Sequence, residues 1–149
     1  MDTLTEERDT MQHLLGLIRQ EQALLLEADI DGMNAITDAK AGAVGRMSEL
    51  VSARLHHLAT AGYPQNDAGM QAWLDSQTGG NVSETWAKLL SLTQAAKEKN
   101  RINGLLINTH LTRNQVALNV LHGADQRGGF YGPDGQAKIS VATRNLIIG

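Results

Sequence analysis

The chain has 149 residues and a net charge of −3, with 3% aromatic residues, two prolines and no cysteine. This length suits one domain, and the scarcity of aromatic residues and proline argues for helices and against a β-sandwich or barrel. The absence of cysteine excludes disulfides and thiolate zinc sites.

Charge is distributed unevenly along the chain. Up to Gly62 there are 10 acidic and 5 basic residues, and after Gly62 there are 6 acidic and 8 basic residues. No basic stripe with stacking aromatic residues is present, so we expect no nucleic-acid partner. The N-terminus is acidic and no apolar run approaches the roughly 18 residues of a membrane helix, which predicts a cytoplasmic protein without membrane insertion.

The first predicted element is an amphipathic helix over about residues 3–29. Its apolar stripe steps by seven residues through Leu4, Met11, Ile18 and Leu25. A strict step of seven is typical of helices that pack against other helices, as in a coiled coil.

A second helix is predicted from about 33 to 61, where Val44, Val51 and Leu58 again step by seven. It ends at Gly62-Tyr63-Pro64, a sequence typical of a helix C-terminus. Because so short a link joins two helices of similar length, we expect an antiparallel hairpin. Residues 62–82 then interrupt the pattern, and a short helix over 67–76 is predicted to cap the bundle.

A third helix is predicted from Asn81 or Ser83 to Gly123. At 1.5 Å per residue it would be about 60 Å long, against about 40–45 Å for each helix of the hairpin, so it should extend beyond its partners. Its predicted inward face comprises Trp86, Leu89, Leu90, Thr93, Ala96, Asn100, Asn103, Ile107, Leu111, Asn114, Ala117, Leu118 and Leu121. The fold predicted is therefore all-α, an antiparallel three-helix bundle over 1–123 with a flexible C-terminal segment over 124–149.

The stretch KNRINGLLINTHLTRN, residues 99–114, places asparagines and Gly104 within this apolar stripe. Both residue types weaken helices. We interpret the stretch as the place where the third helix leaves the hairpin, where asparagine can bond to another chain or to water and glycine admits close backbone approach. Whether Asn100 and Asn103 face the hairpin or a partner is open at this point.

Catalytic motifs are sparse. His56-His57 is the most suggestive pair, since a histidine on a helical bundle can serve phosphotransfer, but the surrounding HHLATAG lacks the lysine and glycine context of such domains. We expect one histidine to touch the edge of the core and the other to face water. No metal-ligand spacing, phosphate loop or nucleophile elbow is present, so no enzyme activity, metal or cofactor is predicted.

The sequence resembles the FlgN family of bacterial flagellar export chaperones. The matching features are NRINGLLI at Asn100–Ile107, the LxLxxL-like ending at Leu118–Leu121, and FYGPDGQ at Phe130–Gln136. The resemblance implies a cytosolic, non-enzymatic chaperone of the flagellar type III export system. Its clients would be the hook-filament junction proteins FlgK and FlgL, bound through their C-terminal helical segments and delivered to the cytoplasmic domain of the export gate.

The resemblance also implies a site, because client binding in this family belongs to the C-terminal part of the chain. Tyr131 is the candidate for docking to the export gate. The candidate client contacts are Ile107, Leu111, Leu118 and Leu121 on the helix, and Ile139, Val141, Leu146 and Ile147 in the tail.

Two other functions remain open from the residues themselves. One is a coiled-coil scaffold or adaptor with a permanent helical partner, and the other is a histidine phosphotransfer domain using His56 or His57. An overhanging apolar helix would equally suit a homodimer.

Overall fold

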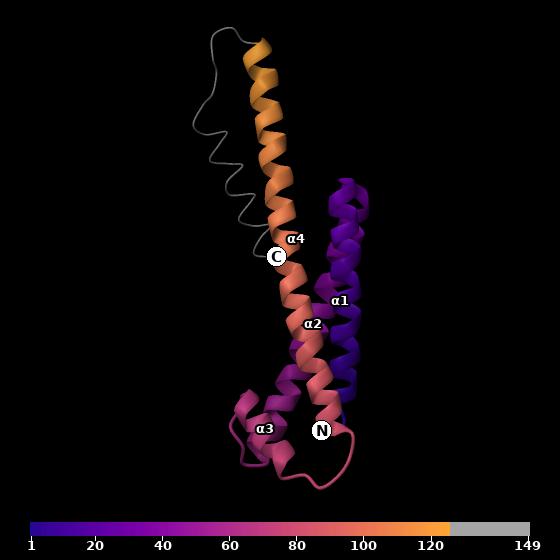
Figure 1. The fold of residues 1–149 in the computed structure, drawn as a ribbon, viewed down its shortest axis with the longest axis vertical. Coiled ribbons are helices and arrows are strands. Elements are labelled where there is room, and N and C mark those ends of the chain that lie inside the picture. The colour runs from indigo at the N-terminus through magenta and orange to yellow at the C-terminus, as the bar shows by residue number, and fades with distance from the viewer. Residues whose placement is uncertain (126–149) are drawn as a thin grey trace.

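The computed structural model describes residues 1–125, which form four helices (Figure 1). They are α1 (Leu4–Glu27), α2 (Ile30–Thr60), α3 (Asp67–Asp75) and α4 (Val82–Asp125), and no strand occurs among these residues. The predicted all-α bundle, with a short helix in the connection before the long one, is confirmed. None of the described helices is long and apolar enough to cross a membrane.

The helix α1 packs along both α2 and α4, whereas α2 and α4 approach each other less closely. Polar pairs between the helices give their directions: Glu7 bonds to Arg54 and Glu21 to Lys40, so α1 and α2 are antiparallel. Ile18 and Glu21 of α1 bond to Asn103 of α4, and α1 and α4 run in the same direction (Figure 1). The short α3 packs beside the lower end of α2.

The core forms from one stripe of each helix. Its buried members are Leu4, Met11, Leu14, Leu15, Leu17, Ile18, Ala43, Met47, Leu58, Met70, Trp73, Leu74, Trp86, Leu89, Leu92 and Ala96. Two sequence predictions are wrong here: Leu90 and Val44 are exposed, and Leu92 takes a core position instead of Leu90. Successive helical residues point about 100° apart, so Leu90 turns away from the hairpin when Leu89 points into it.

The hairpin turn is set by two local features. Ala28 ends α1 in the left-handed conformation, with φ of 55°, and its backbone N–H donates to carbonyls of the last turn. Asp29 then begins α2, because its side chain accepts a hydrogen bond from the Gly32 backbone N–H at 3.0 Å. This N-cap starts α2 three residues before the predicted position.

The long helix α4 extends well beyond the hairpin (Figure 1). It has 44 residues, α1 has 24 residues and α2 has 31 residues. At 1.5 Å per residue these lengths are about 66, 36 and 46 Å. The predicted overhang of the third helix is therefore confirmed.

Gly69 anchors α3 to the preceding loop, and its replacement by alanine is expected to destabilise the protein. Its backbone N–H donates to the Asn66 side chain at 2.8 Å, and an added Cβ would lie 1.9 Å from the Pro64 carbonyl oxygen. Backbone must move to relieve so close a contact, so we expect Gly69→Ala to lower the free energy of unfolding by about 1–3 kcal/mol. Urea denaturation followed by circular dichroism measures the loss; Gly42→Ala, whose Cβ would meet nothing within 4 Å, is the control.

Candidate partner-binding surface

A polar layer, buried at Asn103 and Glu21 and exposed at Asn100, joins the three long helices just below the overhang. The Asn103 side chain amide donates to the Ile18 carbonyl and to the Glu21 carboxylate, both at 2.8 Å. Lys40 of α2 donates to the same carboxylate at 3.3 Å and to the Asn100 side chain oxygen at 2.5 Å. Both asparagines therefore bond to the hairpin, so the part of our interpretation that assigns them to another chain or to water is wrong. The departure of α4 from the hairpin falls later in the same stretch, at Ile107 and Leu111.

This layer has a physical role in the bundle. Asn103 is 1% exposed, and leaving its Nδ2 unpaired at that depth would cost about 1–3 kcal/mol, so the partners of Nδ2 on α1 hold α4 at one axial position; its Oδ1 has no partner among the described residues. A single buried polar residue in a helical seam fixes register in the same way. Gly104 needs another explanation, since an added Cβ there would meet nothing within 4 Å, and no contact among the described residues requires glycine.

A second buried polar cluster lies at the opposite end of the bundle. Arg54 of α2 donates to the Glu7 carboxylate of α1 at 3.0 Å, and its guanidinium lies 4.7 Å from the ring centroid of Trp86 on α4. The cluster again touches all three long helices. Together with the layer at Asn103, this cluster fixes the register of the three helices at both ends of the bundle. The orientation of the apolar face of α4 beyond the hairpin is thereby set as well.

The tip of the hairpin and α4 enclose an apolar groove of about 360 Å³. Ile107 and Leu111, two of the predicted client contacts, are half-buried in its wall. The other lining residues are Leu24, Leu25, Ala28, Asp29, Ile30, Met33 and His110. The groove therefore begins where the packed bundle ends.

Above this groove the same face of α4 has no cover among residues 1–125. Leu118 and Leu121, the other two predicted contacts on the helix, are 49% and 60% exposed. Steps of three and four residues keep them on the side of α4 that carries Ile107 and Leu111. The structure thus brings the four helical candidates onto one continuous face, and their role in client binding stays a prediction.

The overhang carries a second apolar face that the sequence analysis missed. Leu105, Val116 and Val120 are all more than half exposed, and at about 100° per residue they lie on roughly the opposite side of α4 from Leu118 and Leu121. A helix that is apolar on two sides is typical of one that is covered on both. The sequence does contain a signal for this face, because separations of 11 and 4 residues place Leu105, Val116 and Val120 on one side of a helix.

Charge differs between the hairpin tip and the part of α4 that precedes and follows the groove lining. The hairpin tip holds Glu27, Asp29 and Asp31 without a basic residue between them, whereas α4 from 97 to 113 holds four basic residues and one acidic residue. That acid, Glu98, accepts hydrogen bonds from Arg101, and these bonds together with the guanidinium charge lower its pKa. The pair stabilises only α4 itself, since both residues are exposed.

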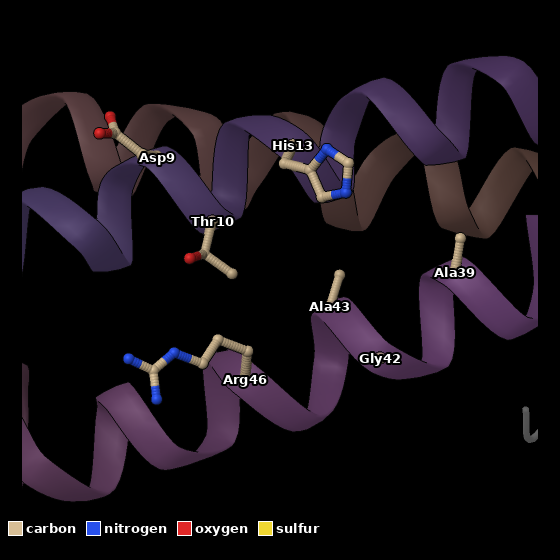
Figure 2. Close-up of a pocket in the computed structure, with 7 residues that line it drawn as sticks. All are labelled: Asp9, Thr10, His13, Ala39, Gly42, Ala43 and Arg46. Atoms are coloured by element: carbon tan, nitrogen blue, oxygen red, sulfur yellow. The ribbon is translucent and has the colours of Figure 1, made fainter.

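Another groove, of about 390 Å³, lies between α1 and α2 (Figure 2). Small residues of α2 form one wall, and Asp9, Thr10 and His13 of α1 lie opposite. Its charged groups already have partners, because Asp9 pairs with Arg8 at 2.6 Å and Arg46 with Glu49 at 2.8 Å. The carboxylate and the guanidinium of this groove are therefore already engaged with neighbouring side chains.

The paired histidines lie apart from these surfaces. His57 is half-buried against the edge of Trp73, with ring centroids 5.6 Å apart, and His56 is exposed, as we expect from the sequence. Within residues 1–125 no three histidine, aspartate or glutamate side chains come together as metal ligands.

The tail candidates lie outside the described residues. They are Tyr131 for gate docking and Ile139, Val141, Leu146 and Ile147 for client binding. Their roles stay predictions.

Comparison with known proteins gives one family and consistent relatives. The family model described as FlgN protein matches residues 1–139. The chain is 27% identical over 150 residues to flagella synthesis protein FlgN of Proteus mirabilis, covering 97% of this chain and 94% of that protein. It is 28% identical over 137 residues to FlgN of Yersinia enterocolitica, covering 91% and 86%. It is 31% identical over 83 residues to FlgN of Salmonella typhimurium, covering 56% and 59%. No solved structure matches.

Proposed function

Since the chain belongs to the FlgN family of flagella synthesis proteins, we propose that it is a cytosolic export chaperone for hook-filament junction proteins. It binds the C-terminal helical segments of FlgK and FlgL, keeps these clients unassembled and delivers them to the cytoplasmic domain of the type III export gate. The activity is non-enzymatic and uses no cofactor.

The observation that carries this proposal is the apolar face of α4 from Ile107 to Leu121, of which Leu118 and Leu121 have no cover among residues 1–125. An amphipathic client segment supplies the stripe that the hairpin, being shorter, does not provide. Covering Leu118 and Leu121, each about half exposed, contributes on the order of 2–3 kcal/mol. Association costs about 4–15 kcal/mol, so these two residues alone do not suffice and further contacts must contribute.

The tail is the proposed source of those contacts. Its apolar residues Ile139, Val141, Leu146 and Ile147 would pack on the client, and Tyr131 would dock to the export gate. Client release then follows from competition at the gate, because the mechanism includes no nucleotide step.

Deleting residues 124–149 tests the tail assignment. We expect residues 1–123 to remain a folded helical bundle, because the core lies entirely between Leu4 and Ala96. The affinity for the FlgK C-terminal segment should fall at least about tenfold, or about 1.4 kcal/mol. Calorimetry measures the affinity and circular dichroism the fold; unchanged affinity would show that the tail does not bind the client.

A pull-down from cell lysate, read by mass spectrometry, separates the chaperone from the alternatives. The chaperone should recover junction proteins and the export gate. A permanent helical partner without the gate would indicate a scaffold, and phosphate on His56 or His57 would indicate a phosphotransfer domain.

A further inference from the structure

The tip of the α1–α2 hairpin presents apolar side chains that do not complete the bundle. Leu26 and Ile30 are 67% and 72% exposed, although they flank the turn between two packed helices. Ile30 also lines the groove described above, together with Leu24 and Met33. The tip therefore extends the apolar surface of α4 onto a second element.

The groove and the overhang have the dimensions of one helix-binding site. From Ile107, in the groove wall, to Leu121 there are 14 residues of α4, or about 21 Å along its axis. An α-helix of about four turns spans that length. Such a helix could lie along α4 with one end against the hairpin tip.

The acidic residues at the tip have no complete structural explanation. Asp29 caps α2, and Asp31 lies in its first turn, where negative charge suits the helix dipole. Glu27 lies in the last turn of α1, where the same dipole disfavours an acid. Among residues 1–125 neither Glu27 nor Asp31 forms an ion pair.

On α4 the basic residue nearest to the groove, Arg113, is not among the residues that line it. Arg113 is exposed one turn above His110, which lines the groove. Within 1–125, Arg113 also has no ion-pair partner. At about 100° per residue Arg113 lies on another side of α4 from Ile107 and Leu111, so a helix bound along these two residues would meet the negative charge of the hairpin tip.

We propose that the hairpin tip is the second half of the partner-binding groove, and that it takes the cationic end of an amphipathic helix of about four turns. Lysine or arginine at that end lies against Glu27 and Asp31, and apolar residues of the helix contact Ile30, Leu111 and Leu118. This inference rests on the proposed function, in which the bound helix belongs to the C-terminal segment of the client.

The test measures the dissociation constant of the FlgK C-terminal segment for the full chain. Two exposed charge pairs contribute about 1 kcal/mol together, so Glu27→Gln/Asp31→Asn should weaken binding about fivefold at ~50 mM salt. The loss should shrink as salt rises, because the affected charges are exposed. The control Asp2→Asn/Glu84→Gln changes net charge equally at the opposite end of the bundle, where Leu4 and Val82 begin their helices, and should leave affinity unchanged.

A second set of measurements, with altered FlgK peptides, tests the chemistry of the partner directly. Replacing the lysine and arginine residues at one end of the FlgK segment with glutamine should cause the same loss with the wild-type chain. It should cause no further loss with Glu27→Gln/Asp31→Asn, since the partner charges are already gone. Ile30→Ser should weaken both peptides alike, because its contact is apolar.

The outcomes separate this inference from the proposed function. If the wild-type chain binds the FlgK segment and Glu27→Gln/Asp31→Asn binds it equally tightly, the role of the hairpin tip is overturned. The proposed chaperone function is not affected by that result. No binding of the FlgK segment by the wild-type chain overturns both. A chain that sediments as a dimer, which Glu27→Gln/Asp31→Asn dissociates, would place a second copy in the groove and also overturn the inference.

Discussion

Replacing Leu118 and Leu121 together with glutamate is expected to abolish client binding without unfolding the protein. Both side chains are exposed in the part of the chain that the structure describes and neither belongs to its core, so the substitutions remove no packing from that core. In the complex each glutamate would have to lose its hydration against an apolar helix. We expect the affinity for the FlgK segment to fall at least about 100-fold, or about 2.8 kcal/mol. Calorimetry gives the affinity, and the thermal midpoint should move by less than about 3 °C.

A matched variant on the other side of α4 makes this experiment specific. Val116→Glu/Val120→Glu adds the same charge at residues that are 57% and 66% exposed, on the opposite apolar face. If the client lies on the face of Leu118 and Leu121, the valine variant should retain binding. Equal losses would contradict that assignment, and a large fall in the thermal midpoint would place Leu118 and Leu121 in the core.

Replacing Arg54 with alanine is expected to lower the free energy of unfolding more than any other substitution proposed for the bundle. Arg54 and Glu7 are 6% and 1% exposed, and removing the arginine leaves a buried carboxylate without its cation and also removes the contact with Trp86. Breaking a buried ion pair in this way costs about 3–5 kcal/mol. Urea denaturation followed by circular dichroism measures the loss.

The chain contains its own control for this prediction. Arg46 also links α2 to α1, through Glu6, but both side chains are about half exposed. Exposed pairs contribute about 0–1 kcal/mol, so Arg46→Ala should change stability little. Losses of similar size in the two variants would contradict the assignment of stability to burial. The double variant Glu7→Leu/Arg54→Met should recover much of the loss, because it leaves no unpaired buried charge.

The helices and their order could be predicted because the signals for them are local. Steps of seven residues, a glycine and proline stop after Leu58, and small polar residues in the connection each act within a few residues of chain. Leu90 and Val44 were predicted to face inward, but each has an adjacent apolar residue, Leu89 and Ala43, that is buried. Periodicity alone does not say which of two adjacent apolar residues faces a partner helix.

The candidate site could be predicted only in part. Ile107, Leu111, Leu118 and Leu121 follow the stripe of one helix, and their common face is a consequence of helical geometry. The contribution of the hairpin tip could not be predicted, because Ile30 and Ile107 are far apart in the sequence and meet only through the packing of α1 against α4.

The sequence by itself determined that this protein is a helical bundle with an overlong third helix, because helix length and amphipathic period are local properties of the chain. The tertiary structure decided which surface Asn100 and Asn103 contact, namely the hairpin. Their partners, Lys40 and Glu21, lie 60 and 82 residues away along the chain. Asn103 is buried, so its side-chain N–H groups must find such a partner or lose their hydrogen bonds, whereas Asn100 is exposed. Only the packed register of three helices brings these groups within reach.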